Sequence, residues 1–258
     1  MRGPLSYIGG KNRLANQIIA VLPEHVTYVE AFAGGCQVLF RKEPSKVEIL
    51  NDLSEDIVNF FRICQSHHDE LVRYLSFTVV SRSWFNLLAK QDPTFLTDVQ
   101  RAARFFYLQK NCFGGLVVNR HYHYSVVEQA NFNPATIPKL LRETHDRLSR
   151  VQIESLPYEE IIKKYDRPTT FFYLDPPYWG RSLYAFNLSN EDFVNMRDRL
   201  RSIQGKFLLS INDVPEIREI FKEFTIDELR LAYSAQPKAG NTYPELLIRN
   251  YPLPSKEA

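Results

Sequence analysis

The sequence predicts an α/β fold in which a parallel-type sheet carries helices on its faces and a mainly helical segment is inserted in the middle. Short apolar runs that suit buried strands alternate with helix-like runs near both ends of the chain, a pattern typical of strand–helix–strand units. Residues 69–150 are mostly helical in pattern. We therefore expect a core formed by residues 1–66 and 151–258 and an insertion over residues 67–150.

Helix-like and strand-like runs alternate from the start of the chain. Residues 12–22 predict a helix that stops at Pro23, and residues 26–30 predict a short strand. The AFAGG stretch reads as a tight turn, and CQVLFRK starts a helix after it. Residues 46–50 predict a second strand, which is followed by a helix over residues 54–64.

The later elements follow the same logic. Glycines and alternating Val and Tyr in residues 111–127 predict a loop or hairpin that interrupts the helical insertion. Strands are then expected over residues 151–154, 169–174, 206–211, near 224–232 and near 245–251, and helices over residues 189–204 and 215–223. Pro215 suits the first turn of the last helix.

The composition is that of a globular protein with one basic region. The 258 residues are 44% hydrophobic, which is enough for a large core. The net charge is only +2, but residues 101–150 hold eight Lys or Arg against three acidic residues, with aromatic residues interleaved. Such a region favours nucleic-acid binding, although a solvated face above core aromatics explains it equally well.

The cysteine and histidine patterns exclude some functions. The three cysteines lie far apart without a CxxC pair, which favours a reducing compartment and argues against structural zinc. No stretch resembles a signal peptide or an apolar bilayer span, so a cytoplasmic protein without membrane contact is expected. The pairs His67-His68 and His121/His123 lack further ligands at metal spacing, and no metal is expected.

The turn after the first expected strand suits a nucleotide-like ligand. The glycines Gly34-Gly35 let the backbone approach a ligand closely, but GxGxxG is absent, so the signal for a dinucleotide is weak. Asp52 ends the second strand, where a carboxylate can accept hydrogen bonds from ribose hydroxyls. A ribose without a pyrophosphate points to S-adenosylmethionine. The alternative is that Asp52 caps the following helix.

YIGGK near the N-terminus resembles a phosphate loop but fails its pattern, because GxxxxGK would need a glycine where Leu5 stands. Lys11 after two glycines could instead meet a carboxylate, and that of the methionine moiety is one candidate. An ordinary helix start remains the alternative.

YLDPPY, residues 173–178, carries the sharpest chemical signal. Proline cannot continue a central strand, so the strand must end at Asp175. The Asp175 carboxylate and the Pro176 carbonyl, held rigid by the prolines, can accept the two hydrogens of an exocyclic amine and direct its lone pair at a sulfonium methyl. The Tyr178 ring can stack on the base, which contributes roughly 1–3 kcal/mol. Transfer would be direct, without a cysteine nucleophile.

These motifs resemble those of the DNA adenine N6-methyltransferases of the Dam type, the D12 or alpha class. YIGGK, VEAFAGG, ILNDLSEDIVNFF, FYLQKNCFGG, FFYLDPPY and ELLIRNY occur in the order of that family over nearly the whole chain. The resemblance implies a Rossmann-like S-adenosylmethionine-dependent methyltransferase core and a helical target-recognition insertion. It implies methylation of adenine N6 in double-stranded DNA, on a base flipped out of the helix.

The resemblance also implies roles for individual residues. The expected cofactor-binding residues are Tyr7, Lys11, Glu30, Phe32, Gly34, Asp52 and Asp175. The expected catalytic residues, which receive the flipped adenine, are Asp175, Pro176, Pro177 and Tyr178.

The recognition loop departs from members that read GATC. They usually have an arginine soon after a Gly-Leu pair and then a Gly-Phe-Asn-Val-Pro-like run, whereas here Val117-Val118 follows Gly115-Leu116 and the run is missing. A specificity other than or looser than GATC is therefore expected. Candidate DNA contacts are Lys110, Asn111, Arg120 and Tyr122. We expect a monomer that acts on duplex DNA; the alternatives are methylation of RNA adenine or cytosine N4, or an inactive DNA-binding relative.

Overall fold

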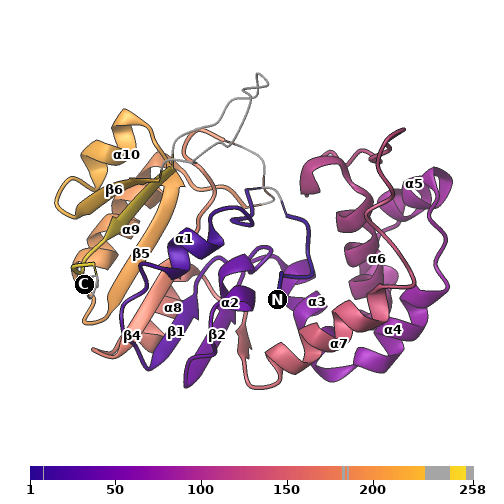
Figure 1. Ribbon diagram of the computed structural model, residues 1–258. Helices are drawn as coiled ribbons and strands as arrows, with labels where there is room; N and C mark the ends of the chain where they lie inside the picture. Colours follow the sequence, from indigo (N-terminus) through magenta and orange to yellow (C-terminus); the bar gives the residue numbers. More distant parts are fainter. Residues whose placement is uncertain (8, 182–183, 185, 230–244, 254–258) are drawn as a thin grey trace.

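The computed structural model describes residues 1–7, 9–181, 184, 186–229 and 245–253. Within these residues, one seven-stranded sheet has the strand order β3-β2-β1-β4-β5-β7-β6 (Figure 1). Its strands are β1 (Thr27–Glu30), β2 (Val47–Asn51), β3 (Gln152–Glu154), β4 (Thr170–Leu174), β5 (Lys206–Asn212), β6 (Thr225–Leu229) and β7 (Glu245–Arg249).

The sheet is Rossmann-like, which confirms the fold class expected from the sequence. Strands β1 to β5 are parallel and follow the order 3-2-1-4-5 of that fold. Strand β7 runs antiparallel between β5 and β6. The carboxyl ends of β1, β2 and β4 therefore meet at one edge, which is where open sheets of this kind bind ligands.

Neighbouring residues of each strand point to opposite faces of the sheet. Both faces carry apolar side chains, and helices cover each of them. Tyr28 and Leu50 pack into the cluster that includes α1 (Ala15–Ile19), α2 (Gln37–Arg41) and α3 (Glu55–Ser66). Val29 and Ile49 pack into a second cluster on the opposite face. That cluster includes residues of α8 (Tyr158–Tyr165), α9 (Asn190–Arg201) and α10 (Pro215–Ile220).

The middle of the chain is helical, as expected, and lies beside the sheet (Figure 1). It contains α4 (His68–Ser76), α5 (Arg82–Lys90), the short 3₁₀ helix η1 (Pro93–Phe95), α6 (Asp98–Asn111), the 3₁₀ turn η2 (Phe113–Gly115) and α7 (Ile137–Leu148). The loop or hairpin expected over residues 111–127 is found as η2 and a single antiparallel bridge between Cys112 and Tyr122.

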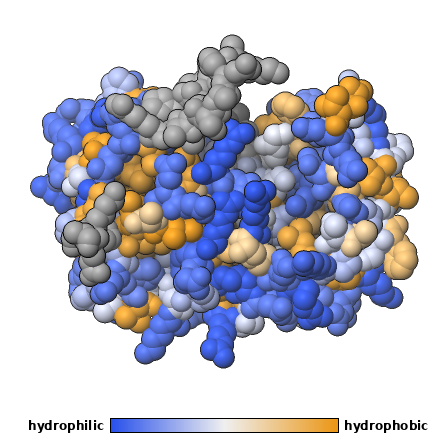
Figure 2. All heavy atoms as spheres, in the orientation of Figure 1, coloured by the Kyte–Doolittle hydropathy of each residue, from blue (hydrophilic) through white to orange (hydrophobic). Residues whose placement is uncertain are grey.

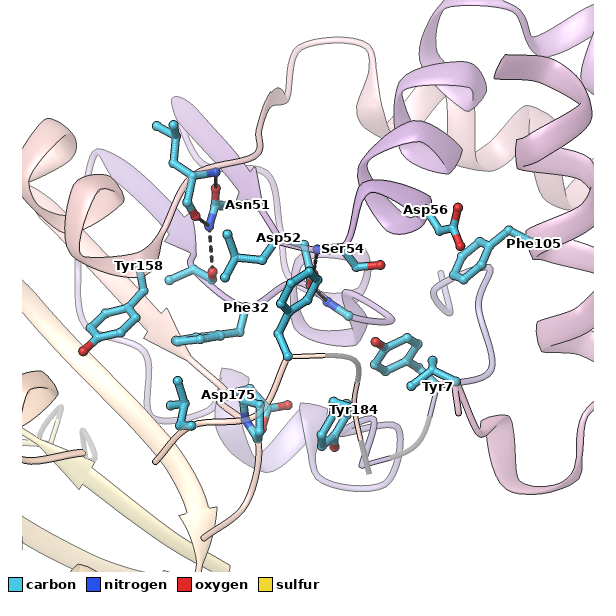
Figure 3. Close-up of a pocket in the computed structure, with 18 of the residues that line it drawn as sticks. Tyr7, Phe32, Asn51, Asp52, Ser54, Asp56, Phe105, Tyr158, Asp175 and Tyr184 are labelled. Carbon is cyan, nitrogen blue, oxygen red and sulfur yellow. Dashed lines mark hydrogen bonds between the residues drawn. The ribbon is translucent and has the colours of Figure 1, made fainter. Parts of the chain in front are cut away.

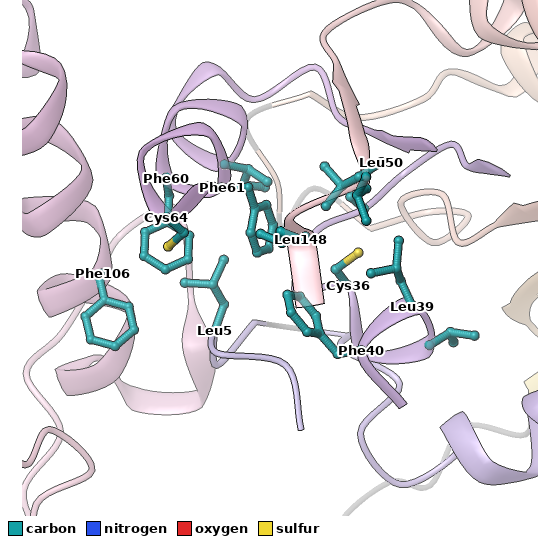
Figure 4. Packing of buried hydrophobic residues seen from close by; sticks show 14 of the residues in the cluster. Leu5, Cys36, Leu39, Phe40, Leu50, Phe60, Phe61, Cys64, Phe106 and Leu148 are labelled. Atoms are coloured by element: carbon teal, nitrogen blue, oxygen red, sulfur yellow. The ribbon is translucent and has the colours of Figure 1, made fainter. Parts of the chain in front are cut away.

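The packing between this helical segment and the core is continuous. Phe60 of α3 stacks on Phe106 of α6 with ring centroids 5.4 Å apart, and Figure 4 shows Phe106, Phe60 and Leu148 in one cluster with Leu50 of the sheet. The insertion therefore shares its hydrophobic core with one face of the sheet.

Polar side chains cover much of the surface seen in Figure 2, and apolar atoms show both over the sheet on the left and over the helical part on the right. Phe77 and Phe95, which are 86% and 88% exposed, belong to this helical part. No helix in the described part of the chain is both long and apolar enough to cross a bilayer.

Candidate active site

An elongated cleft opens at the carboxyl edge of the sheet. Figure 3 shows Phe32 and Tyr158 on one side of it and Asp56 and Phe105 on the other. Seven of the predicted site residues line it: Tyr7, Phe32, Gly34, Asp52, Arg120, Asp175 and Pro177. A smaller adjoining cavity is lined by Lys11 and Glu30 together with four of the same residues. The structure thus brings the predicted cofactor-binding residues together, although they come from distant parts of the chain.

The turn after β1 is shaped by its glycines. Gly34 has a φ of +48°, and a Cβ atom added there would lie 3.1 Å from the Tyr7 ring. Glycine is therefore required for the close approach of Tyr7. The Tyr7 ring in turn stacks on Tyr184 with 6.2 Å between ring centroids, so two aromatic rings form one wall of the cleft.

Glu30 ends β1 as a buried carboxyl. Its Oε2 accepts hydrogen bonds from the Tyr28 hydroxyl at 2.9 Å and from the Leu39 N–H at 3.1 Å. Burial raises the pKa of Glu30 to about 8, and the bonds from Tyr28 and Leu39 oppose that rise. Glu30 is therefore largely protonated at neutral pH.

Asp52 follows β2 and faces the cleft. Its Oδ2 accepts from the Gly34 N–H and its Oδ1 from the Ser54 N–H, both at 2.8 Å. Burial raises the pKa of Asp52, and these backbone bonds counteract the rise. The bond to Ser54 secures the turn into α3. Ser54 and not Asp52 is the N-cap residue of α3, and no side chain caps that helix, so the capping alternative is wrong; the Asp52 carboxylate lines the cleft.

Asp175 directly follows β4. Its Oδ1 accepts from Lys11 Nζ at 2.5 Å and from Ser210 Oγ at 3.3 Å. Within the described residues, no group donates to Asp175 Oδ2 or to the Pro176 carbonyl. Burial raises the pKa of Asp175 to about 6, against the effect of Lys11. One carboxylate oxygen is thus anchored, while the other remains an available acceptor.

The Asp-Pro-Pro-Tyr loop is fixed by the ends of β5 and β7. Asn212 accepts from the Trp179 N–H at 2.9 Å and donates to the Trp179 carbonyl at 3.3 Å. The Tyr178 hydroxyl donates to Glu245 Oε2 at 2.6 Å. These bonds hold the loop from both sides, so its polar groups keep a set position relative to the sheet.

Lys11 contacts carboxylates, as its position after two glycines suggested. These carboxylates are side chains of the protein, Asp175 and Glu245. Its Nζ lies 2.5 Å from Asp175 and 3.1 Å from Glu245. Burial would lower the pKa of Lys11, but the two carboxylates outweigh this and hold it well above its usual value. A contact between Lys11 and the cofactor stays a prediction.

The four candidate DNA contacts lie around the end of α6 and the loop after it; Asn111 is buried, and the other three are half-buried. Arg120 lines the cleft, and its Nε donates to Gln109 Oε1 at 3.2 Å. Lys110 lies over the Phe106 ring, and Tyr122 packs edge-on against Phe85. Asn111 is 3% exposed.

Asn111 also has a role inside its own helix, because its amide donates to the Tyr107 carbonyl one turn earlier in α6. From the sequence, its amide was a candidate partner for the edge of an adenine. All four DNA contacts stay predictions.

Several residues of the site were not predicted. Asn51 binds Ala31 and Leu156 through its amide and so joins the ends of β1 and β2 to the segment after β3. The others are Tyr158, Tyr184, Ser210, Asn212 and Glu245. The position of Asn51 next to Asp52 at a strand end could have indicated from the sequence that Asn51 lies at the cleft. Within the described residues, no group of three or more His, Cys, Asp or Glu is arranged to hold a metal ion.

A Rossmann-like sheet with a carboxylate facing the cleft after β2 and an Asp-Pro-Pro-Tyr loop after β4 has the arrangement in which open α/β sheets bind nucleoside ligands. Comparison with known families makes the assignment specific. The family of D12 class N6 adenine-specific DNA methyltransferases matches residues 7–234, and the chain belongs to this family.

Related proteins agree with this assignment over almost their full lengths. The type II methyltransferase M1.LlaDCHI of Lactococcus lactis subsp. cremoris is 26% identical, with 95% of this chain and 94% of the relative covered. M.MjaIII of Methanocaldococcus jannaschii is 26% identical, with 96% and 98% covered. M.CviBI of Paramecium bursaria Chlorella virus NC1A is 23% identical, with 97% and 100% covered. The resemblance identified from the motifs is confirmed.

Proposed function

We propose that the protein transfers a methyl group from S-adenosylmethionine to the N6 amino group of adenine in double-stranded DNA. The observation that carries this proposal is the asymmetry of Asp175. Lys11 and Ser210 anchor Oδ1, while Oδ2 and the Pro176 carbonyl have no donor among the described residues. Two open acceptors on one rigid loop match the two hydrogens of an exocyclic amine.

The residues of the cleft fit the cofactor. Asp52 would hold the ribose hydroxyls, and the Phe32 and Tyr158 rings, which pack on each other with centroids 5.6 Å apart, would together form an apolar wall against the adenine moiety. Lys11, Glu30, Gly34 and Tyr7 line the adjoining cavity, where the methionine moiety would lie. When bound, S-adenosylmethionine supplies an electrophilic methyl group on a sulfonium.

The protein groups then act on the target base. The Asp175 carboxylate and the Pro176 carbonyl would accept hydrogen bonds from the two amine hydrogens, which localises the nitrogen lone pair toward the methyl carbon. As the N–C bond forms, the C–S bond would break with release of S-adenosylhomocysteine, and one amine proton would be lost to the solvent. Pro177 stiffens the loop, and the Tyr178 ring stacks on the base that has left the duplex. No covalent enzyme intermediate is needed.

Under this proposal, two parts of the chain have different roles. Residues 1–66 and 151–258 bind the cofactor and carry out the transfer, and residues 67–150 select the DNA site. Lys110, Asn111, Arg120 and Tyr122 remain the candidate DNA contacts. The sequence after Gly115-Leu116 supports a target other than or broader than GATC, read by a monomer on duplex DNA.

Methyl transfer to duplex DNA tests the proposal, with radiolabelled cofactor and with the methylated base identified and mapped by sequencing. We expect N6-methyladenine that is not confined to GATC. Asp175→Asn keeps the size of the side chain but removes the anionic acceptor, so turnover should fall roughly a hundredfold or more. Asp213→Asn is the matched control, because Asp213 follows β5 and pairs with Arg218. Equal turnover in the Asp175→Asn variant and the wild type would overturn the mechanism.

A further inference from the structure

Glu245 is a buried carboxylate that the mechanism above does not use. Strand β7 is antiparallel to β5, so its first residue, Glu245, lies opposite Asn212 at the same edge as the site. Its side chain is only 7% exposed. A buried carboxylate needs partners to offset its lost hydration, and the partners of Glu245 are the site residues Tyr178 and Lys11.

The contacts of Glu245 close a ring of three side chains with Tyr178 and Lys11, and Asp175 is joined to this ring through Lys11. The Tyr178 hydroxyl donates to Glu245 Oε2 at 2.6 Å, and Lys11 Nζ lies 3.1 Å from Glu245 Oε1. The same ammonium lies 2.5 Å from Asp175 Oδ1 and 3.2 Å from the Tyr178 hydroxyl oxygen. It is also 4.9 Å from the centre of the Tyr178 ring.

The ammonium is shared unequally between the two carboxylates. Among the described residues, Glu245 Oε1 is buried without a hydrogen bond and faces only the Coulomb attraction of Lys11, while Oε2 accepts the bond from the Tyr178 hydroxyl. One positive charge cannot neutralise two carboxylates. Asp175 therefore keeps more negative charge on its open oxygen than an isolated ion pair with Lys11 would leave.

On the basis of the proposed function, we propose that Glu245 is a positioning residue of the methyl-transfer site. It fixes the Tyr178 ring through the hydroxyl and draws the Lys11 ammonium partly away from Asp175. The open oxygen of Asp175 thereby stays a strong acceptor for the amine.

The charge environment of Asp175 makes this role measurable. Burial raises the pKa of Asp175 to about 6, Lys11 lowers it, and Glu245 raises it. Removal of the charge of Glu245 should therefore lower the pKa of Asp175. The titratable groups that face Asp175 are Lys11, Glu30, Tyr173, Tyr178, Tyr184 and Glu245.

The variant Glu245→Gln isolates the charge, because the amide oxygen can still accept the bond from the Tyr178 hydroxyl. We expect kcat to fall roughly tenfold, as for the loss of a charge-assisted contact, with KM for DNA and cofactor little changed. The acid limb of the kcat profile should move to lower pH. Asp227→Asn on the neighbouring β6, whose carboxylate pairs with Arg249, should leave both unchanged.

A second readout does not depend on turnover. The titration of Asp175, followed by NMR of ¹³C-labelled aspartate carboxyls and assigned with Asp175→Asn, should have a lower midpoint in Glu245→Gln than in the wild type. An unchanged midpoint, or a rate that falls equally at every pH, would overturn the proposal. Failure of the proposed function would look different: the wild-type protein itself would methylate no adenine in duplex DNA.

Discussion

Glu30 shows how a single buried residue changes the behaviour of the whole protein with pH. Its pKa is raised by burial to about 8 in the folded protein, whereas the unfolded chain ionises it at the ordinary value near 4.5. The unfolded state therefore binds fewer protons between these values. A group of this kind contributes stability that is present at low pH and lost as pH rises through the folded value.

Glu30→Gln should remove this dependence, because the amide keeps an acceptor for Tyr28 and Leu39 and does not ionise. We expect the free energy of unfolding of the variant, relative to the wild type, to rise between pH 5 and pH 8, at up to about 1.4 kcal/mol per pH unit. Urea unfolding at both pH values measures it. Glu216→Gln, at an exposed position of α10, should show no such trend. A constant difference for Glu30→Gln would contradict the assigned protonation.

The sequence predicted the location of site residues well wherever the end of a strand could be recognised. Asp52 and Asp175 were placed correctly at the cleft, because a carboxylate directly after a buried parallel strand must lie at the carboxyl edge of the sheet. Asn111 shows the limit of such reasoning. An amide before a loop can contact DNA or bond its own helix, and only its burial and its bond to Tyr107 reveal what it does in the fold.

At the scale of elements, the loop that follows α6 rests directly on the N-terminal segment. Gln109 of α6 donates to the Ser6 carbonyl at 3.0 Å and to the Gly115 carbonyl at 3.2 Å. A Cβ atom on Gly115 would lie 2.9 Å from backbone atoms of Ser6 and Tyr7. Because Tyr7 lines the cleft, the loop and the cofactor site share a boundary.

Two adjacent glycines test that boundary. Gly114 and Gly115 both have positive φ, +63° and +68°, but nothing lies within 4 Å of a Cβ atom on Gly114. Gly114→Ala should therefore cost only backbone strain, about 1 kcal/mol. Gly115→Ala should cost several times more and should also weaken binding of S-adenosylhomocysteine, because it displaces Tyr7. Urea unfolding and calorimetric titration measure the two effects; similar values for both variants would show that the loop does not press on the N-terminal segment.

Helix α8 was not predicted from the sequence, although its residues fit a helix. Glu159 and Glu160 lie in its first turn and Lys163 and Lys164 in its last, which suits the helix dipole. The run is only eight residues long and lies between two strands, so its apolar positions are too few for a clear period. Its packing against the sheet, through Ile161 and Ile162, stabilises it.

At the scale of the whole molecule, the topology explains why Glu245 could not be found from the sequence. Functional residues of an open α/β sheet are sought after parallel strands. An antiparallel strand begins at that same edge, so its first residue enters the site, and β7 is the strand that does so. Lys11, Asp175 and Glu245 meet only because of this reversal, which strand patterns alone do not reveal.

The shared hydrophobic core predicts how the molecule unfolds. Helix α3 joins the two parts: Phe60 stacks on Phe106 of α6, Asp56 pairs with Arg101 of α6 at 2.6 Å, and Gln65 donates to the Leu148 carbonyl at the end of α7. Separating the helical insertion from the sheet would expose this apolar face to water. We therefore expect one cooperative thermal transition rather than two.

Ligand binding should shift that single transition as a whole. S-adenosylhomocysteine at a hundred times its Kd should stabilise the folded state by about 2.7 kcal/mol. The cleft is lined by the sheet edge and also by Phe105 and Arg120 of the insertion. The ligand should therefore stabilise both parts together, and neither should unfold ahead of the other. Differential scanning calorimetry, with tryptophan fluorescence as a local probe, measures this. Trp84 lies in α5 of the insertion and Trp179 in the Asp-Pro-Pro-Tyr loop region of the core, so Trp84→Phe and Trp179→Phe each leave one reporter. Coincident transitions that move together with ligand support a single cooperative unit; a ligand-independent transition reported by Trp84 would mean that the insertion folds by itself.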